Sequence, residues 1–430
     1  MYILYNTILF AAMLVILPCF LLIMVFTGKY RKSVVRVLVG RQRQILTNLA
    51  DGPRVWIHAV SIGEVTAAAP IVASLKLKRP EIIIIFSTST ETGQQMAQQL
   101  VKSADAFIYF PLDIGYVVRK IIRLAKPDVF VMVETELWPN FLKACRLNKV
   151  KTLIVNGRIS PRSYKKYRPT MYFWKRVLAD ICAAGMIAEV DAARIKSIGM
   201  AKDRVEVLGN AKYDALAAMA TPDLQEEIGR RVNRHGGERF FVAGSTHSGE
   251  EEIVIRVYQQ LLKHYDNFKL IIVPRYVERT VAVRELLQLA GLPDIITMTE
   301  MNNGKIRKKE RIIIVDVIGE LFKIYSLATI VYCGGSLVPK GGQNILEAAA
   351  WGKVIFYGPS MEDFSEEKVL LEDIGCGVTI SNEQELTQGI IQVLKHPEEL
   401  EIRGARGKSV VAANMGAAAR YAEMIRKELG

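Results

Sequence analysis

The chain contains Val55-Trp-Ile-His-Ala-Val-Ser-Ile-Gly-Glu64, in which an ionisable carboxylate stands where an apolar strand gives way to a helix. The first residues predict a buried strand, Ser61 to Gly63 predict a tight turn, and the helix-forming run Val65–Leu77 follows. Because ligands of open α/β sheets bind outside the carboxyl ends of the strands, we expect Glu64 at the rim of a cleft. The alternative is a capping box, in which Glu64 only reaches back to the Ser61 backbone N–H.

Length, charge and cysteine content indicate what kind of protein this is: a folded chain of two domains with an anionic partner. At 430 residues the chain exceeds the size at which one hydrophobic core keeps growing, so two domains are expected. Half of the residues are hydrophobic, which excludes a disordered chain. The net charge of +13 suggests an anionic partner: nucleic acid, a phospholipid surface or a phosphorylated substrate. The five cysteines are odd in number and lack CxxC spacing, so they predict small buried hydrophobes rather than disulfides or a zinc site.

An apolar N-terminus predicts a single membrane anchor. Residues 1–28 carry no charge, and the run Ile8–Phe26, interrupted only by Pro18, approaches the ~20 residues that a membrane-spanning helix needs. A signal peptide fits less well, since a basic n-region and a small-residue cleavage site are missing. Six basic residues and no acidic one follow in residues 29–50. The positive-inside rule then places the rest of the chain on the cytoplasmic side, with the basic segment against anionic lipid.

Beyond the anchor, strand and helix patterns alternate, which indicates βαβ units and parallel sheets. The stretch Phe240–Glu250 repeats the plan of Val55–Glu64: a strand, a glycine-containing turn and a glutamate. Two facing Rossmann-like domains are therefore predicted, and they describe the GT-B α/β architecture of sugar-nucleotide transferases, an analogy that does not by itself give function. The expected parts are a transmembrane helix (1–28), a basic juxtamembrane segment (29–52), an N-terminal acceptor-binding domain (53–213), a linker (214–237) and a C-terminal nucleotide-sugar domain with the terminal helices (238–430).

The strands are expected at apolar runs bounded by turn signals. The predicted strands are Val55–Val60, Ile82–Ser87, Phe107–Phe110, Val129–Val133, Thr152–Asn156, Met186–Ala188, Arg239–Ala243, Lys269–Val273, Arg311–Val315, Thr329–Cys333 and Val354–Tyr357.

Two more charged residues of the N-terminal half are candidates for the cleft. The strand Val129–Val133 runs directly into Glu134, and a carboxylate at that point is unfavourable unless it is solvated or paired. Lys212 falls at the predicted domain junction, where its ammonium group can reach either side. As an isolated lysine it would be ordinary surface.

A glycine-rich stretch, Gly334–Glu347, follows a strand of the C-terminal half. Its backbone can approach an anion closely, and a helix starting near Asn344 would point its N–H groups at a phosphate. Glu347, on the first turn, is placed for a ribose hydroxyl. The stretch matches neither the Rossmann GxGxxG nor a P-loop, which disfavours a dinucleotide or ATP. The alternative is a glycine-rich loop without a ligand.

Two other positions of the C-terminal half suit a nucleotide. Pro274 and Arg275 lie just past the strand Lys269–Val273, where a guanidinium can hold a phosphate through two hydrogen bonds, although a surface ion pair is nearly as good an interpretation. The stretch of Ile318, Gly319, Glu320 and Leu321 follows the next strand and can offer backbone groups to a base.

Residues 158–176 contain seven basic and five aromatic side chains. This mixture is typical of single-stranded nucleic-acid binding and equally of a phosphorylated lipid head group at a membrane interface. The predicted anchor favours the lipid. The expected acceptor-binding residues are Arg158, Arg162, Lys165, Lys166 and Arg168.

The sequence has no Asp-x-Asp motif and no histidine pair with metal-ligand spacing. We therefore expect a reaction without metal or cofactor, in which a helix dipole and basic side chains hold the leaving phosphate. His247 is expected to be a helix-start residue rather than a ligand.

Taken in order along the chain, these features resemble the family of 3-deoxy-D-manno-octulosonic acid (Kdo) transferases. The motifs that carry the resemblance are the anchor, Ser61-Ile-Gly-Glu64, Glu134-Thr-Glu-Leu-Trp-Pro139, Asn156-Gly-Arg-Ile-Ser160, Gly244-Ser-Thr-His247, Pro274-Arg275 and Gly341-Gly-Gln-Asn-Ile-Leu-Glu347. The resemblance implies a GT-B, inverting, metal-independent transferase of lipopolysaccharide biosynthesis. Such an enzyme moves Kdo from CMP-Kdo to the lipid A precursor (lipid IVA) on the cytoplasmic face of the Gram-negative inner membrane.

The resemblance also implies roles for single residues. The general base falls on Glu64, and the pair that stabilises the transition state falls on Glu134 and Lys212. The implied CMP contacts are Pro274, Arg275, Ile318 to Leu321, Asn344, Ile345, Leu346 and Glu347.

Two rival functions remain open from the residues. One is a lipid glycosyltransferase of the same architecture that uses a UDP-sugar. The other is a membrane-tethered basic protein that binds nucleic acid, which leaves the carboxylates of the cleft unexplained.

Overall fold

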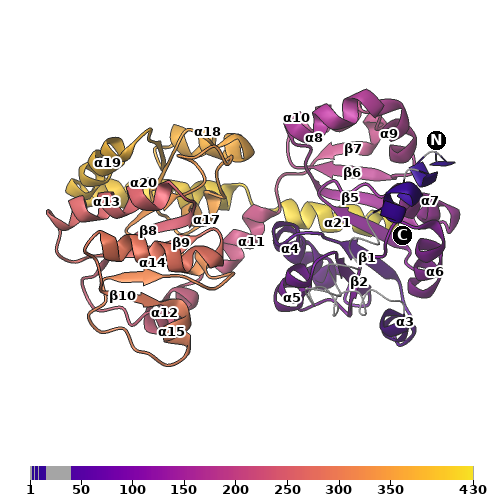
Figure 1. Cartoon of the computed structure of the whole chain (residues 1–430). Helices are drawn as coiled ribbons and strands as arrows, with labels where there is room; N and C mark the ends of the chain where they lie inside the picture. Colours follow the sequence, from indigo (N-terminus) through magenta and orange to yellow (C-terminus); the bar gives the residue numbers. More distant parts are fainter. Residues whose placement is uncertain (1, 4, 8, 16–39, 430) are drawn as a thin grey trace. The chain divides into compact units, whose positions relative to one another are not determined.

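The computed structural model describes residues 2–3, 5–7, 9–15 and 40–429 (Figure 1). The chain divides into two compact units: residues 1–215 together with 414–430 form unit 1, and residues 216–413 form unit 2. Each unit holds one seven-stranded sheet in which neighbouring strands are parallel. The prediction of two Rossmann-like α/β halves is therefore confirmed.

Unit 1 is built on the sheet β3-β2-β1-β4-β5-β6-β7. Its strands are β1 (Arg54–His58), β2 (Ile83–Thr88), β3 (Ala106–Tyr109), β4 (Val129–Val133), β5 (Lys151–Gly157), β6 (Ala183–Met186) and β7 (Val205–Val207). Its helices are α3 (Gly40–Thr47), α4 (Ile62–Lys78), α5 (Glu91–Leu100), α6 (Gly115–Ala125), α7 (Pro139–Leu147), α8 (Pro161–Tyr167), α9 (Met171–Leu178), α10 (Glu189–Ser197) and α21 (Ala417–Leu429), while α11 (Lys212–Met219) leads into unit 2.

Helices cover both faces of this sheet, which is why its strands read as continuous apolar runs rather than alternating ones. Trp56 and Phe130 pack with α6 and α7 on one face, whereas Val55 and Val131 pack with α4 and α21 on the other. All four side chains are fully buried. The strands are thus held by the hydrophobic effect from both sides.

Unit 2 is built on the sheet β10-β11-β9-β8-β12-β13-β14. Its strands are β8 (Arg239–Thr246), β9 (Phe268–Pro274), β10 (Ile295–Thr297), β11 (Ile312–Ile314), β12 (Ile330–Cys333), β13 (Ile355–Tyr357) and β14 (Gly377–Thr379). Its helices are α12 (Pro222–Arg231), α13 (Glu250–Leu262), α14 (Thr280–Leu289), α15 (Met298–Asn302), α16 (Leu321–Tyr325), α17 (Leu346–Ala350), α18 (Ser365–Asp373), α19 (Glu383–Lys395) and α20 (Pro397–Ala413).

The strand order of each sheet reverses at one place. In unit 1 the chain moves outward from β1 to β2 and β3, then returns to place β4 on the other side of β1. In unit 2 the same reversal lies between β8 and β12. Such a switch point leaves a crevice at the carboxyl ends of the two strands, where ligands of doubly wound folds bind. Glu64 and Glu134 follow β1 and β4, and His247 and Gly334 follow β8 and β12.

The structure corrects the predicted domain limits. The last helix, α21, does not belong to the C-terminal domain 238–430 but packs in the core of unit 1 through Tyr421, Ala422 and Ile425. The expected linker 214–237 contains α12 and most of α11. The helix α21 belongs to unit 1 because its apolar face packs against α4. Sequence periodicity indicates an apolar face but not which distant helix it contacts.

The predicted membrane anchor lies mostly outside the described residues. Within residues 2–3, 5–7, 9–15 and 40–429, no helix has both the length and the apolar character that spanning a membrane requires. The described start of the chain contacts other residues of unit 1. The Tyr5 hydroxyl donates to Asp113 Oδ2 at 2.9 Å, the Tyr5 ring stacks on Phe173 at 5.9 Å between centroids, and Asn6 Nδ2 donates to Asn140 Oδ1 at 3.2 Å.

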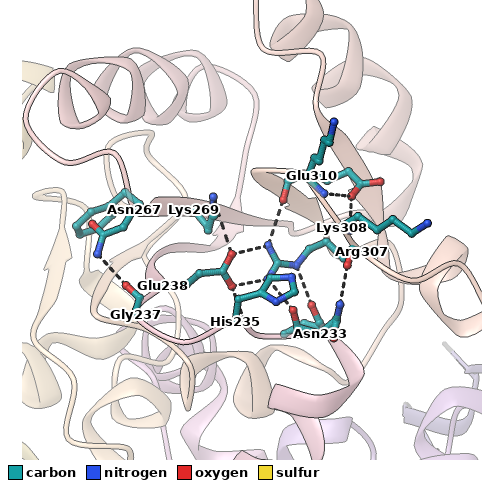
Figure 2. A network of polar contacts seen from close by, with 12 residues as sticks. Asn233, His235, Gly237, Glu238, Asn267, Lys269, Arg307, Lys308 and Glu310 are labelled. Carbon is teal, nitrogen blue, oxygen red and sulfur yellow. Dashed lines mark hydrogen bonds and ion pairs between the residues drawn. The ribbon is translucent and has the colours of Figure 1, made fainter.

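A buried arginine joins three segments of unit 2 (Figure 2). Arg307, only 1 % exposed, forms an ion pair with Glu238 and donates to the carbonyl oxygens of Val232 at 2.8 Å, Asn233 at 2.9 Å and Glu310 at 3.1 Å. Burial alone would raise the pKa of Glu238, but the hydrogen bonds and charge of Arg307 hold it below its usual value. The network lies at the amino end of β8, opposite the carboxyl ends where ligands bind, so we assign it to stability.

Candidate functional site

The three predicted catalytic residues lie together at the switch point of unit 1. Lys212 Nζ forms an ion pair with Glu134 Oε1 at 2.9 Å. A Cβ atom at Gly63 would lie 3.8 Å from Lys212 Nζ, so the ammonium group also lies beside the turn that precedes Glu64. The charges of Glu134 and Glu136 act on the Glu64 carboxyl group. Three segments far apart in sequence thus form one charged cluster.

Glu64 does form the capping box of α4. The Ser61 hydroxyl accepts the Glu64 backbone N–H at 3.4 Å. In return the Glu64 carboxylate accepts the backbone N–H groups of Val60 at 2.7 Å and Ser61 at 3.2 Å, and the Ser61 hydroxyl at 2.8 Å. The capping alternative is therefore correct for the contacts of this side chain. Capping fixes the carboxylate in place, which a positioned base also requires.

The environment of Glu64 brings its pKa close to neutrality. The pKa of Glu64 is raised to about 7 in all, and burial, with only 5 % of the residue exposed, is the largest cause. Within this total the Val60 N–H and the Ser61 side chain lower the pKa, while the negative charges of Glu134 and Glu136 contribute to the rise. A general base is most effective when its pKa lies near the working pH. Simple capping does not require this shift.

The segment that carries Lys212 is held from two sides. Asn156, at the end of β5, accepts the Ala211 backbone N–H on its side-chain oxygen at 2.8 Å. Tyr421 of α21 donates its hydroxyl to the Gly209 carbonyl at 2.7 Å. Neither Asn156 nor Tyr421 was predicted to support the site. Asn156 stands in the quoted motif, whereas nothing near Tyr421 in the sequence signals its long-range contact.

Left-handed backbone geometry recurs where strands meet the candidate sites. Glu134, Asn156 and Ser245 have φ values of 61°, 53° and 54°. A non-glycine residue in a sparsely populated conformation costs about 1–3 kcal/mol and persists where its surroundings enforce it. Glu134 keeps its hydrogen bond to the neighbouring strand, donating its N–H to the Val155 carbonyl at 2.9 Å. The sheet thus holds Glu134 in a conformation that a free chain would rarely adopt.

The predicted acceptor-binding residues form a basic surface next to this cluster. Arg158 is half-buried, while Arg162, Lys165, Lys166 and Arg168 are exposed on α8 and the turn after it. The surface connects to the site because the Thr135 hydroxyl, next to Glu134, donates to the Arg158 carbonyl at 2.6 Å. Tyr172, 81 % exposed, adds an aromatic ring.

The predicted nucleotide contacts gather at the carboxyl ends of adjacent strands of unit 2. Pro274 ends β9 and Arg275 is exposed just after it, with its N–H bonded to the Thr246 carbonyl at 2.9 Å. The stretch 318–321 ends on the first residue of α16, and Asn344 precedes α17, where its side-chain oxygen accepts the Leu346 N–H at 3.2 Å. The sheet therefore brings the three predicted stretches to one edge.

Two of these residues contribute no side chain to that edge. Ile345 and Leu346 are at most 1 % exposed and pack in the core, so only their backbone groups can reach a ligand. The Glu320 carboxylate is held by Arg231 at 3.0 Å and Lys323 at 3.4 Å. The sequence did not indicate that the side chains of Ile345 and Leu346 point into the core, or that Glu320 is held by ion pairs.

The glycine-rich loop after β12 differs from the prediction. Its backbone amides do surround an anion, but the anion is Glu250 of α13, which is fully buried. The Glu250 carboxylate accepts the N–H groups of Gly335 at 2.7 Å, Ser336 at 3.0 Å and Leu337 at 3.0 Å, together with the Tyr332 hydroxyl at 2.7 Å. These three amides are therefore not available to a phosphate.

The two glutamates of the sequence repeat thus have different surroundings. Glu64 lies in a charged cluster with Glu134 and Lys212, whereas Glu250 is enclosed by backbone donors. No group of three or more His, Cys, Asp and Glu side chains that could hold a metal ion is found within the described part of the chain.

Similarity to solved structures defines the class of fold. UDP-GlcNAc 2-epimerase from Neisseria meningitidis bound to UDP-GlcNAc aligns with a TM-score of 0.61 at 14 % identity, covering 87 % of this chain and 99 % of that chain. A putative UDP-N-acetylglucosamine 2-epimerase from Listeria monocytogenes aligns equally well, covering 87 % and 95 %. At this identity the likeness shows the fold alone, and the fold is GT-B-like.

Sequence similarity then points to one family of transferases. Residues 34–215 match the model of the 3-deoxy-D-manno-octulosonic-acid transferase (kdotransferase) family. A bifunctional glycosyltransferase/methyltransferase of Fusobacterium nucleatum is 33 % identical over 365 residues, which cover 84 % of this chain and 56 % of that protein. A 3-deoxy-D-manno-octulosonic acid transferase of Haemophilus influenzae is 29 % identical over 381 residues, 87 % of each chain. Over most of its length the chain is therefore similar to Kdo transferases, which are glycosyltransferases.

Proposed function

We propose that this chain transfers Kdo from CMP-Kdo to the lipid A precursor, with inversion and without a metal ion, and that Glu64 is the general base. The observation that carries the proposal is the position of Glu64. Its carboxyl group is buried with a pKa of about 7 beside the Glu134–Lys212 pair, in a chain that is similar to Kdo transferases.

The proposed reaction joins the acceptor to the sugar in one displacement. A hydroxyl oxygen of the acceptor bonds to the anomeric carbon of Kdo, while the bond from that carbon to the phosphate oxygen of CMP breaks. The electron pair leaves with CMP, and the hydroxyl proton passes to Glu64. A positioned base contributes typically 10²–10⁴-fold to such a step, because an alcohol is a very weak acid at neutral pH.

The ion pair beside Glu64 suits the transition state of this reaction. Lys212 can neutralise the carboxylate of Kdo or the leaving phosphate, and Glu134 can stabilise positive charge that develops at the anomeric carbon. Because Lys212 is already paired at 2.9 Å, its charge is positioned before the substrate arrives. Preorganised charge needs no reorganisation during the reaction.

Membrane attachment is part of the same proposal. The anchor within residues 1–28 and the basic segment 29–52 would hold unit 1 at the cytoplasmic face of the inner membrane, against anionic lipid. The exposed basic residues of α8, such as Lys165 and Lys166, would then contact the phosphates of the lipid acceptor. A phosphorylated lipid and a basic surface are complementary.

The test is mass spectrometry of the lipid A precursor after incubation with CMP-Kdo and the full chain. The product mass should rise by whole Kdo units. Glu64→Gln should lower the turnover by about 10²–10⁴-fold while leaving CMP binding unchanged. A near-normal rate for this variant would restrict Glu64 to its capping role.

Ser61→Ala provides the matched control. It removes the hydroxyl that caps α4 and keeps the carboxylate that is proposed to act as base. If capping alone explained the loss in Glu64→Gln, Ser61→Ala would show a comparable loss. We expect its turnover to stay within about tenfold of the unsubstituted chain, since a lost cap costs only about 1 kcal/mol.

The rival with a UDP-sugar is separated by a nucleotide panel. CMP should stabilise the protein thermally, whereas UDP should not. The nucleic-acid rival predicts RNA affinity that falls steeply with salt.

A further inference from the structure

The side chain of His247 has an unusual position at the switch point of unit 2. The residue is 8 % exposed, and its Nε2 atom has no hydrogen-bond partner among the described residues. The neighbouring Thr246 Oγ1 is buried and unpartnered in the same way. Buried polar atoms are nearly always paired, so an unpaired one calls for an explanation such as a ligand.

The surroundings of His247 suit an anion. A Cβ at Gly335 would lie 3.5 Å from His247 Nε2, so the ring lies against the glycine-rich loop, where φ of Gly335 is +68°. Burial lowers the pKa of His247, and the charges of Lys340 and Arg275 lower it further, against the opposing effect of Glu250. The imidazole is therefore neutral at neutral pH and can donate one hydrogen bond beside two cations.

The backbone amides of the glycine-rich loop are already occupied, so an anion at this place would have to be bound by side chains. Three of its amides, from Gly335 to Leu337, are already bonded to the Glu250 carboxylate. The same carboxylate accepts the His247 backbone N–H at 3.0 Å. Glu250 thus fixes the backbone of His247 and that of the loop to one point, which holds the imidazole against the loop.

We propose that His247 binds the phosphate of the donor nucleotide, with Nε2–H donating to a phosphate oxygen, and that Glu250 is the positioning residue that holds both segments. Arg275 and Lys340 supply the positive charge. The inference rests on the proposed function in one respect: the nucleotide is taken to be CMP. It differs from the sequence interpretation, in which His247 only begins a helix and the loop amides hold the phosphate.

The test is isothermal titration of the full chain and its His247→Ala and His247→Gln variants with two probes, CMP and cytidine. If His247 contacts the phosphate, His247→Ala should weaken CMP binding by about 10-fold or more, the value of one hydrogen bond to a charged group. Its affinity for cytidine, which has no phosphate, should not change. His247→Gln, whose amide N–H can reach the same oxygen, should recover most of the CMP affinity.

His264→Ala is the matched control, because His264 is exposed in the same unit. It should bind CMP like the unsubstituted chain. An equal loss of CMP and cytidine affinity in His247→Ala would overturn the proposal in favour of a structural role, and so would unchanged CMP affinity.

Failure of the proposed function has a different signature. The unsubstituted chain would then bind UDP instead of CMP, and the same variants are compared with UDP and uridine. A loss for UDP but not for uridine in His247→Ala would support the phosphate contact even though CMP is the wrong nucleotide. Equal losses for UDP and uridine, or none, would overturn it.

Discussion

Lys212 Nζ lies 2.9 Å from Glu134 Oε1, although 78 residues separate them in sequence. Glu134 follows β4, while Lys212 begins α11 after the last strand of the sheet. The pair places one positive and one negative charge beside Glu64. The cluster and the segments that support it have consequences that can be measured separately.

The first prediction concerns pH. Activity should require the ionised form of Glu64, so kcat/KM should rise with pH through the pKa of about 7 and level off above it. Glu134→Gln removes a negative charge that raises this pKa and should therefore move the acidic limb to lower pH, whatever its effect on the maximal rate. The measurement is the pH profile of kcat/KM for both proteins. A limb that stays in place would show that Glu64 does not control it.

The second prediction concerns Asn156, which holds Lys212 through the Ala211 backbone. Asn156→Gly keeps the left-handed backbone accessible but removes the acceptor, and it should lower kcat by about 10²-fold, the typical cost of a displacement near 1 Å. Asn156→Asp retains an acceptor oxygen and should keep most of the rate. Steady-state kinetics compare the two, and an equal loss in both would mean that the hydrogen bond is not what matters.

The third prediction concerns stability and Arg307. Arg307→Met leaves the buried Glu238 carboxylate without its partner and should lower the free energy of unfolding by about 3–5 kcal/mol (Figure 2). Lys308→Met is the control, since Lys308 is the exposed neighbour in sequence. Guanidinium unfolding of both variants measures the difference. Equal free energies of unfolding for the two variants would show that the Arg307 network does not stabilise unit 2.

The fourth prediction concerns the basic surface on α8. Replacing Arg162, Lys165 and Lys166 by alanine should raise KM for the lipid acceptor and leave CMP affinity unchanged, because the residues lie in unit 1 and the predicted CMP contacts lie in unit 2. Raising the salt concentration should have a similar effect on the unsubstituted chain, since exposed charges are screened. An unchanged KM in the triple variant would exclude this surface from acceptor binding.

The positions of the strands could be read from local sequence. Val129–Val133 matches β4 residue for residue, because a strand buried on both faces needs a continuous apolar run. The three-residue strands β7, β10 and β14 were missed, whereas β11 and β13, which are equally short, were predicted. The segment expected at Met186–Ala188 is instead Ala183–Met186, a shift of the kind that local patterns do not resolve.

The carboxylates at the strand ends were likewise visible in the sequence. Glu64 and Glu134 follow apolar runs, and the parallel topology brings such positions to one edge of a sheet. What each carboxylate contacts depends on hydrogen-bond partners that arrive from distant segments. Glu250 repeats the pattern of Glu64, yet it is enclosed by the amides of a loop more than eighty residues further along.

Apolar pattern and turn residues thus indicated most of the strands and which stretches of chain follow their carboxyl ends, since both depend on neighbours in the chain. Only the folded molecule decided that Glu250 rather than a phosphate fills the amides of the loop, that Tyr421 supports the segment of Lys212, and that α21 belongs to unit 1. These outcomes depend on which buried donors and apolar faces meet across long sequence separations, and the cost of leaving a buried polar group unpaired selects among them.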